Sequence, residues 1–403
     1  MGFVKYFLMK VIKLSYSLLL LILSLYGFIK VKPTSVQKYH KSDLVKFPFV
    51  FSQVGCTPME KVYSEFDHDA SEWAISWPGR VSQYDLVYKS PPIDPMQGIP
   101  LGNGEVGALL WCEESKIIIA VNKSDLWDDA SFGTFHNHSG KELDYSTTLR
   151  HGCRIIIDFK YPVFSFLYLS DFSGRLSLSD ATLSIESSSP FGKIGFKGFV
   201  DPQSGALIYE LSSDMNEDVP VDITLEHLGS RTFSDWYSHI NRDASIGLPG
   251  TEAMAAYSGA YITQSLTSGT SAVGGRVVDD NGLKVGYIRE HSRSTLIQLS
   301  GNRHKKASFI FIVTSPVAGD PVSSIKSRFP LEGKSIEETV RSHGETWKSV
   351  WHRSFMDYED DYLNNLWYLT MYYLNASQGG KYPGRFFSLI IDNSQIQNIG
   401  YIK

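Results

Sequence analysis

Several acidic residues of this chain could supply the pair of carboxyl groups that acid–base hydrolysis requires. One group stands at Asp128-Asp129, and a second runs from Asp357 to Asp361 and includes Glu359 and Asp360. Such chemistry needs one carboxyl group to protonate the leaving oxygen and a second group on the opposite face as base or nucleophile. Spacing along the chain does not identify a pair, and adjacent acids on loops usually lie in solvent or at helix starts. We therefore assign none of them as catalytic from the sequence.

Metal and thiol chemistry find little support in the sequence. His136 and His138 could direct both imidazoles to one side of a strand, but they stand in a polar stretch with no third ligand nearby. Cys56, Cys112 and Cys153 are too few and too scattered for a disulfide scaffold or a Cys-x-x-Cys metal site. Cys112 ends an apolar run, which favours a reduced thiol in the core. We expect no metal and no other cofactor.

The most distinctive stretch, Ile99 to Asp129, predicts a hairpin that presents two loops at one end. Asn103-Gly104 fits a turn that needs a positive φ, and Val106 to Trp111 is typical of a buried strand. Glu113 to Lys116 indicates a polar turn, after which Ile117 to Val121 forms the returning strand. The residues before the first strand and after the second are therefore expected to lie side by side.

This stretch resembles the start of the N-terminal β-domain of glycoside hydrolases of the family-95 α-L-fucosidase type and their relatives. The β-domain of those proteins begins with a sequence similar to LGNGRLGA, which is followed by a sequence similar to LNEDTLW. The matching residues here are Leu101, Gly102, Asn103, Gly104, Val106, Gly107, Ala108, Asn122, Asp125, Leu126 and Trp127. A well-made β-hairpin alone would also explain the glycines. The resemblance covers roughly residues 70 to 387 and implies a β-sandwich, a helical linker and the first helix of an (α/α)6 toroid.

The resemblance also implies where a sugar could bind. It points to Asn122, Trp127 and Asp128 in the second loop, and to Arg385. Arg385 stands in a stretch, Gly379 to Phe387, that is similar to the loop bordering the sugar pocket in relatives. Its planar guanidinium could bind a hydroxyl or a carboxylate, although a plain surface arginine would look the same. The family's acid and base belong to later toroid helices, and this chain ends before them, so no particular sugar or linkage can be carried over.

Composition and charge limit the function classes. With 403 residues, 42% of them hydrophobic and 20% charged, the chain is typical of a globular protein. Its formal net charge of −5 is small, and no long Lys/Arg run follows the N-terminus, so nothing electrostatic favours a nucleic-acid partner. An aromatic content of 13% suits surfaces that stack on sugar rings, although a large aromatic core would explain most of it. The expected partner is a carbohydrate substrate or glycan ligand.

The N-terminal residues 1–30 indicate a signal peptide or signal anchor. Lys5, Lys10 and Lys13 accompany the apolar run Leu14 to Ile29. This pattern predicts a secreted or periplasmic protein. The run is slightly short of the ~20 residues that span a bilayer, and an uncleaved segment would leave the protein anchored to a membrane. Residues 31–70 are polar and weakly periodic, which is typical of a linker.

Residues 71–330 predict a mainly β fold, a large antiparallel β-sandwich of the supersandwich kind. Short strand-like runs alternate with clusters of turn residues. Val219 to Leu225 alternates strictly between apolar and polar residues, which places one face of that strand inward. Between Arg175 and Ile185 the apolar positions change from even to odd, which predicts a bulge or corner near Ser179-Asp180.

After Pro330 the apolar period changes to about 3.6 residues and predicts helices. Ser335 and Glu338 form a capping box at the start of a linker helix within residues 331–357. A second helix, Asp360 to Ser377, would begin the toroid within residues 358–387 and stop at Gly379-Gly380. The remaining residues, 388–403, form an atypical tail without a helical period.

Two hypotheses from different classes follow. The first is an exported glycoside hydrolase-like protein of carbohydrate metabolism that is catalytically incomplete, because the chain ends before the toroid's acid and base residues. The alternative is a stand-alone carbohydrate-binding or structural β-sandwich module. A reading frame beyond the stop codon that encodes further toroid helices would favour the first hypothesis.

Overall fold

A computed structural model gives the architecture. It describes the following residues: 65–67, 72–74, 77–128, 134–136, 142–144, 148–227, 231–233, 244–246, 251–256, 259–266, 268–279, 282–291, 294–301, 305–328, 336–353 and 356–377. The predicted signal segment 1–30, nearly all of the predicted linker 31–70 and the tail 388–403 lie outside these ranges. The domain boundaries drawn from the sequence therefore stay predictions.

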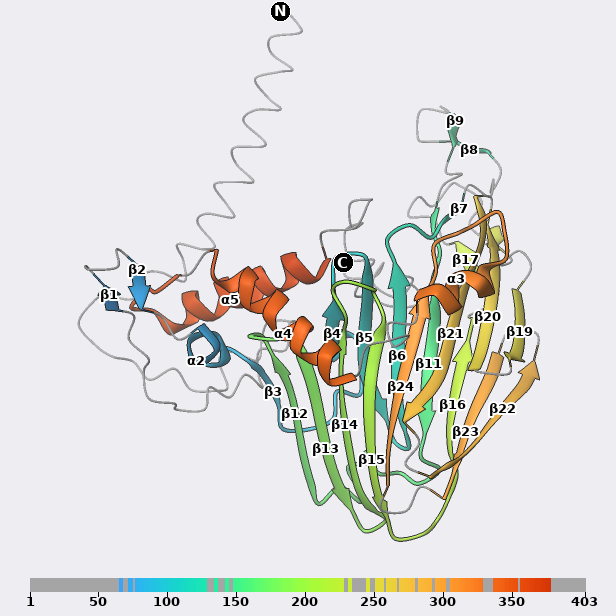
Figure 1. Cartoon of the computed structure of the whole chain (residues 1–403), viewed down its shortest axis with the longest axis horizontal. Helices are drawn as coiled ribbons and strands as arrows, with labels where there is room; N and C mark the ends of the chain where they lie inside the picture. The colour runs from blue at the N-terminus through green and yellow to red at the C-terminus, as the bar shows by residue number, and fades with distance from the viewer. Residues whose placement is uncertain are drawn as a thin grey trace, which may run out of the picture. The chain divides into compact units, whose positions relative to one another are not determined.

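Two large antiparallel sheets make up most of the described chain (Figure 1). The seven-stranded sheet has the order β22 (Lys284–His291), β23 (Ser294–Ser300), β16 (Val221–Glu226), β11 (Cys153–Asp158), β6 (Lys116–Lys123), β5 (Val106–Glu113) and β4 (Ile99–Gly102). The nine-stranded sheet has the order β19 (Thr251–Ala256), β20 (Gly259–Leu266), β21 (Gly269–Asp279), β24 (Lys305–Val313), β15 (Leu207–Met215), β14 (Gly192–Val200), β13 (Thr182–Ser189), β12 (Asp171–Ser177) and β3 (Leu86–Tyr88).

The smaller elements lie before, between and after these strands. Four two-stranded pairs join β1 (Glu65–Asp67) with β2 (Glu72–Ala74), β7 (Trp127–Asp128) with β10 (Thr148–Leu149), β8 (Thr134–His136) with β9 (Glu142–Asp144), and β17 (Arg231–Phe233) with β18 (Ala244–Ile246). The helices are α2 (Trp77–Ser82), the 3-10 turn η3 (Pro95–Gln97), α3 (Pro321–Arg328), α4 (Ile336–Trp351) and α5 (Asp361–Ser377). Among the described helices, none is long and apolar enough to cross a lipid bilayer.

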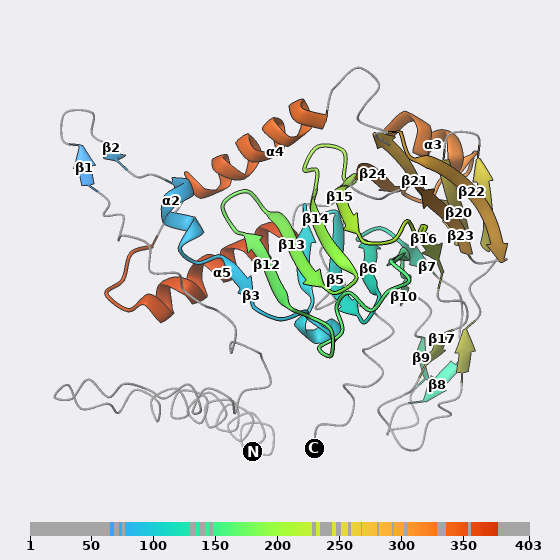
Figure 2. The ribbon, with the colours of Figure 1, turned by 90° about the horizontal axis from the view of Figure 1, so that it is seen from below.

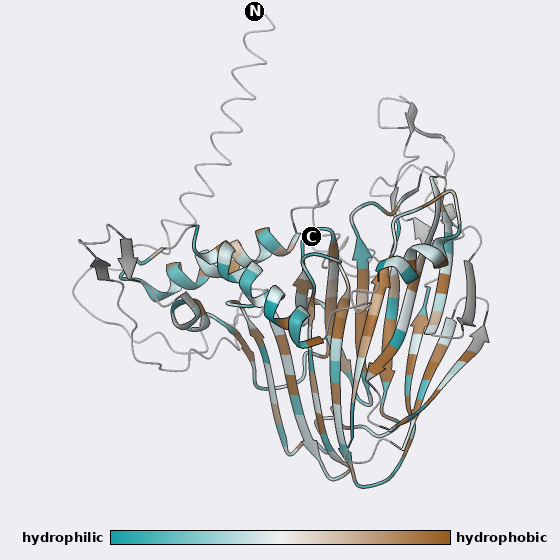
Figure 3. Cartoon of the chain, in the orientation of Figure 1, coloured by the Kyte–Doolittle hydropathy of each residue, from teal (hydrophilic) through white to brown (hydrophobic). Residues whose placement is uncertain are grey.

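One core lies between the two sheets and confirms the predicted β-sandwich followed by helices. Ile119 and Ile223 of the seven-stranded sheet belong to the same buried cluster as Phe196 and Phe309 of the nine-stranded sheet. Inward residues of β11 and β16 are buried and their neighbours only partly so, as the period-two pattern predicts. Figure 3 shows this alternation as hydrophobic and hydrophilic bands along the strands.

The change of phase between Arg175 and Ile185 is a hairpin rather than a bulge. β12 ends at Ser177, and Ser177 pairs with Thr182 of β13, so the chain reverses within four residues. Ala181 closes this turn with a φ of 52°. Asp85 holds the turn by accepting a hydrogen bond from the Leu178 N–H at 2.8 Å, and burial raises the pKa of this carboxyl to about 6. The sequence located the corner correctly but did not predict the reversal.

The helices α4 and α5 occur where the 3.6-residue period predicts them, and both pack on the sandwich. α5 begins one residue after the predicted start, and Asp360 caps it by accepting from the Tyr362 N–H at 2.8 Å. The expected cap of α4, Ser335, lies outside the described residues. Figures 1 and 2 place both helices beside β12 to β14 and away from β19 to β22.

Aromatic rings join the helices to each other and to the rest of the fold. The ring of Tyr368 stacks on Tyr84 with centroids 4.7 Å apart, and Trp347 stacks on Tyr372 at 5.4 Å. The indole of Trp351 donates a hydrogen bond to the Leu178 carbonyl at 2.9 Å. The opposite side of α5 exposes large apolar side chains, namely Tyr362, Leu363, Leu366, Tyr373 and Leu374.

Helix α3 was not predicted, although its start carries a helix signal. Asp320 precedes Pro321 and accepts hydrogen bonds from the N–H groups of Val322, at 3.0 Å, and Ser323, at 3.2 Å. Ile325 is the buried residue of the helix and packs against Gly274 of β21. The helix is eight residues long. A helix of this length makes only about two turns, so its apolar residues recur too few times to reveal a period of 3.6 residues.

Candidate functional site

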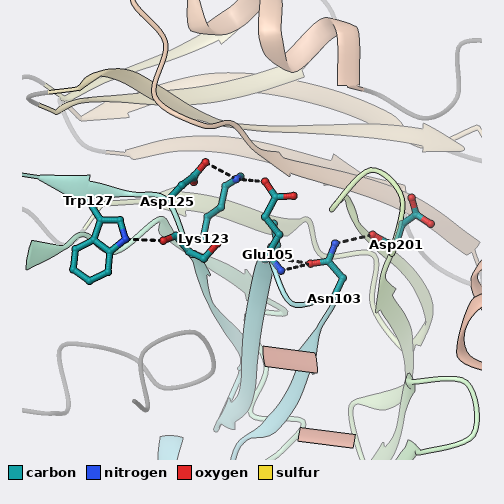
Figure 4. Close-up of polar contacts among 8 residues, drawn as sticks. Asn103, Glu105, Lys123, Asp125, Trp127 and Asp201 are labelled. Carbon is teal, nitrogen blue, oxygen red and sulfur yellow. Dashed lines mark hydrogen bonds and ion pairs between the residues drawn. The ribbon is translucent and has the colours of Figure 1, made fainter. Parts of the chain in front are cut away.

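The hairpin β5–β6 presents its two loops at one end, as predicted. β5 and β6 pair from Val106–Lys123 to Glu113–Lys116, and Gly104 has a φ of 89° in the turn before β5. The Ser124 N–H donates to the Glu105 carbonyl at 2.9 Å, which joins the loop after β6 to the turn before β5. We call residues 103–105 and 122–127, with the side chains that contact them, the loop end (Figure 4).

Asn103 fixes the first loop and connects it to the other sheet. Its side-chain oxygen accepts from the N–H groups of Glu105, at 3.0 Å, and Val106, at 2.8 Å. This pattern is an Asx turn, in which the side chain replaces a backbone acceptor. The Asn103 amide nitrogen donates to the Asp201 carbonyl at 3.2 Å, and Asp201 lies between β14 and β15. One asparagine therefore shapes the turn and fixes its place against the nine-stranded sheet.

Lys123 supplies a fully buried positive charge at the loop end. Its ammonium group forms ion pairs with Glu105 and, at 2.9 Å, with Asp125, and Figure 4 shows it between the two carboxylates. The Lys123 side chain is 0% exposed, whereas those of Asp125 and Glu105 are 14% and 39% exposed. A buried ammonium is tolerated only when such partners replace its hydration. The three charges sum to −1, and Glu105 is the member most open to a ligand.

The C-terminal end of α5 completes this region. The Gly104 N–H donates to the Ala376 carbonyl at 2.9 Å, and the Tyr372 hydroxyl donates to the Pro100 carbonyl at 2.7 Å. A Cβ atom on Gly102 would lie 2.2 Å from the Ala376 oxygen, so only glycine fits there. The Leu-Gly-Asn-Gly segment, residues 101–104, thus forms the surface against which the last turn of α5 packs.

The four predicted sugar-binding residues are only partly described. Asn122 lies at the loop end but is 1% exposed. Trp127 is half-buried against the core, and its indole N–H donates to the Ser124 carbonyl at 2.8 Å. Asp128 belongs to β7, but its side chain is outside the described residues, as is Arg385. The structure therefore places Asn122 and Trp127 at the same loop end, and the sugar-binding role of all four stays a prediction.

Two of the acidic residues before α5, Asp357 and Asp360, have structural partners. Asp357 forms an ion pair with Arg80 of α2 at 2.5 Å, Asp360 caps the helix, and Asp361 starts it. Glu359 is exposed. Asp129 lies outside the described residues. Within the described part of the chain, these contacts give none of them a place in a carboxyl pair.

Histidine and arginine side chains near the loop end were missed by the sequence reasoning. Arg150 and His151 lie two to three residues before β11 starts, and His227 follows β16; all three are buried. Burial, together with the neighbouring His151, lowers the pKa of His227 to about 3. His227 continues the inward series Val221, Ile223, Leu225, so the period-two pattern could have found it.

Potential metal ligands and thiols can be located among the described residues. Within the described ranges, no three His, Cys, Asp or Glu residues are arranged to hold a metal ion. Cys112 and Cys153 are buried free thiols, which confirms the expected core thiol at Cys112. Burial raises the pKa of both cysteines, so they are inert packing residues.

Comparisons with known proteins show the fold. No family model matches the sequence, and no curated protein is detectably similar to it. The structure is similar to a protein described as a kojibiose phosphorylase from the human microbiome, with a TM-score of 0.51 and 11% identity over 78% of this chain and 42% of that one. This chain therefore spans about two fifths of that protein's length, and at this identity the likeness shows a shared β-sandwich fold alone.

Two further solved structures are similar at lower scores. One is a glycosyl hydrolase of the gh92 family, with a TM-score of 0.39 and 10% identity over 73% of this chain and 41% of that one. The other is a bacterial glucoamylase complexed with acarbose, with a TM-score of 0.35 and 9% identity over 73% and 44%. None of the three descriptions names a fucosidase, so the likeness does not single out the family-95 type.

Proposed function

We propose that this chain provides the β-sandwich framework of a protein that acts on glycans, of the glycoside hydrolase-like kind. The observation that carries the proposal is the likeness of its fold to the protein described as a kojibiose phosphorylase. The family-95 type resemblance of the loop end supports the same class from the sequence. In this framework the loop end, with Glu105 partly exposed and Trp127 half-buried, is where the sandwich meets the sugar.

The loop end is suited to bind a sugar rather than to cleave one. Glu105 and Asp125 both pair with the Lys123 ammonium, so both carboxyl groups already hold a structural partner. A glycosidase acid must instead carry a proton at the leaving oxygen, opposite a second carboxyl about 5 to 9.5 Å away. The exposed carboxylate of Glu105 accepts hydrogen bonds from sugar hydroxyls. We therefore propose glycan contact without turnover by this chain alone.

Turnover and binding assays on the full chain test this function. Aryl α-L-fucosides, α-galactosides and pectin-derived oligosaccharides should be hydrolysed at the background rate, because proton transfer, usually worth about 100-fold or more, has no positioned pair here. Binding to at least one glycan of a broad array should be measurable. Turnover that is lost in Glu105→Gln would refute the binding assignment and make the loop end catalytic. Absence of any glycan binding would refute the carbohydrate function.

Export is part of the proposal and rests on the sequence alone. The basic start and the apolar run Leu14 to Ile29 support a secreted, periplasmic or membrane-anchored protein. Fractionation of cells that carry an epitope after Lys403 should find the tag outside the cytoplasm. The mass of the mature N-terminus then distinguishes cleavage from anchoring. A tag that is found only in the cytosol would refute export.

A stand-alone binding module is the second candidate, and one observation favours it. Phe166 and Tyr168 are 59% and 45% exposed, and they lie in the connection from β11 to β12, whose backbone is held by hydrogen bonds such as that from the Leu169 N–H to the Ser165 carbonyl at 2.9 Å. Exposed aromatic side chains that are held by ordered backbone are typical of binding surfaces.

A further inference from the structure

An exposed aromatic surface lies at the end of the sandwich opposite the loop end. It is formed by the connection from β11 to β12, residues 159–170, and by the turn between β13 and β14. The β5–β6 hairpin separates the two ends: its turn at Glu114 accepts from the Phe164 N–H at 2.8 Å, and its loops lie at the far end. Strands of eight residues span about 26 Å, so the two surfaces cannot share one small ligand.

Three rings form one contact group on this surface. Tyr161 and Phe191 are stacked with centroids 5.0 Å apart and planes 17° from parallel. Tyr168 meets Phe191 edge-on, with centroids 5.3 Å apart and planes at 71°. Phe166 stands two residues before Tyr168 and is 59% exposed. We call Tyr161, Phe166, Tyr168 and Phe191 the aromatic platform.

The backbone beneath the platform is held by many hydrogen bonds. The Ser165 carbonyl accepts from the N–H groups of Tyr168, at 3.0 Å, and Leu169, at 2.9 Å. The Ser187 hydroxyl donates to the Val163 carbonyl at 2.7 Å, and the Ser170 N–H donates to the Ser188 carbonyl at 2.9 Å. These bonds fix the loop to β13. A surface that is ordered before binding loses little conformational entropy when a ligand arrives.

The polar rim of the platform is acidic. The Tyr161 hydroxyl donates to Glu217 Oε2 at 2.5 Å, and this bond raises the pKa of the phenol. Asn216, Glu217 and Asp218 are consecutive exposed residues beside the rings. The nearby Lys160 ammonium is already paired with Asp222 at 2.6 Å and Asp158 at 3.3 Å.

This combination selects one class of ligand. Carboxylates at the rim repel phosphate groups, so the surface does not suit anionic lipid or nucleic acid. Ring faces carry partial negative charge and attract weakly positive C–H groups. A pyranose presents C–H groups on its face and hydroxyl donors around its edge, which matches aromatic faces that are bordered by carboxylates. The large hydrophobic side chains exposed on this surface are Phe166, Leu167 and Tyr168, a smaller apolar area than a stable protein–protein interface buries.

We propose that the aromatic platform is a binding site for neutral glycan chains, separate from the loop end. One or two sugar rings stack on Tyr168 and Phe166, while Glu217 accepts hydrogen bonds from their hydroxyls. This inference rests on the proposed glycan function and adds to it a second contact. The second contact would hold a polymeric substrate at the far end of the sandwich.

Affinity electrophoresis of the full chain tests the platform. Native gels contain one neutral polysaccharide each, namely galactomannan, xyloglucan, arabinoxylan or mixed-linkage glucan. The variants are Phe166→Ala/Tyr168→Ala and Glu217→Gln. The matched control is Tyr362→Ala, because Tyr362 is 58% exposed on α5, away from the platform. Circular dichroism and thermal midpoints establish that each variant is folded.

We expect at least one polysaccharide to retard the native chain and the Tyr362 variant equally. The double variant should lose about tenfold or more in affinity, the usual effect of removing aromatic anchors. Glu217→Gln should show a smaller loss. Equal retardation of the double variant and the native chain would refute the platform while leaving the glycan function standing. If none of the four gels and no array glycan retains the native chain, both proposals are wrong.

Discussion

Replacing Lys123 with methionine should destabilise the loop end more than any exposed charge change does. The Lys123 ammonium is fully buried between Glu105 and Asp125. Methionine keeps most of the aliphatic stem and removes the charge, so packing changes little. The substitution leaves two carboxylates facing each other without a cation, and the Asp125 side chain is only 14% exposed.

The size of the effect follows from the exposure of the two carboxylates. Removing one partner from a buried ion pair costs about 3 to 5 kcal/mol. The Glu105 side chain is 39% exposed, so water can hydrate its carboxylate once Lys123 is replaced. The free-energy cost of losing this ion pair therefore falls toward the ~1 kcal/mol of a surface pair. We expect Lys123→Met to lower the free energy of unfolding by about 3 kcal/mol, mostly through Asp125. Adding Asp125→Asn removes the stranded charge and should restore about half of that loss.

Urea unfolding of the full chain, followed by tryptophan fluorescence and circular dichroism, measures these differences. Coincident transitions by the two probes justify a two-state treatment. The matched control is Lys306→Met, since Lys306 is 63% exposed and pairs with Glu210 at 3.5 Å. Its cost should not exceed about 1 kcal/mol. Equal losses in Lys123→Met and Lys306→Met would refute the reasoning, because the buried ammonium would then contribute no more than a surface charge.

Two further predictions concern the docking of α5 and the buried histidine. Gly102→Ala places a Cβ 2.2 Å from the Ala376 oxygen, so it should destabilise the fold by about 1 to 3 kcal/mol and speed amide exchange in the last turn of α5. Gly319→Ala, which meets nothing within 4 Å, is its control, and equal exchange in the two variants would contradict the docking. The pKa of His227 falls from 6.5 to about 3 on folding, so between these values the unfolded chain binds the extra proton. Stability should therefore decrease as the pH falls, by up to about 1.4 kcal/mol per pH unit. His227→Leu should flatten the slope measured by urea unfolding at pH 7, 6 and 5, and an unchanged slope would show that His227 gains its proton in the folded state.

The sandwich could be predicted from the sequence because its evidence is local. Alternation along β16 and the apolar run of β5 indicate strands without knowledge of their neighbours. The order of the strands could not be predicted in this way. β16 lies between β11 and β23, and β24 lies between β15 and β21, and both arrangements join segments far apart in the chain. The β12–β13 reversal also depends on such a contact, since Asp85 of a distant segment holds its turn.

The sequence predicted the position of the candidate site but not the residues that form its ion pairs. The sequence located the two loops and drew attention to Asn122 and Trp127, because they match the start of the family-95 type β-domain. It passed over Glu105 and Lys123, whose ion pair depends on the pairing of Val106 with Lys123. Lys123 follows Val121 by two residues, so it continues the inward face of β6, where a lysine would be costly without a partner.

The glycines of the Leu-Gly-Asn-Gly text show how a local explanation can hide a long-range one. A hairpin turn needs Gly104, which has a φ of 89°, but it gives no reason for Gly102, which forms part of β4. The reason for Gly102 is the Ala376 carbonyl, which leaves no space for a Cβ. The Gly104 N–H binds the same carbonyl, so both glycines receive the end of α5. The turn and the helix are therefore one structural unit, and α5 ends directly beside the loop end. This arrangement gives a physical reason for the motif and the helix to occur together, and it makes the contact between them the point where the sandwich can position whatever the helical segment carries.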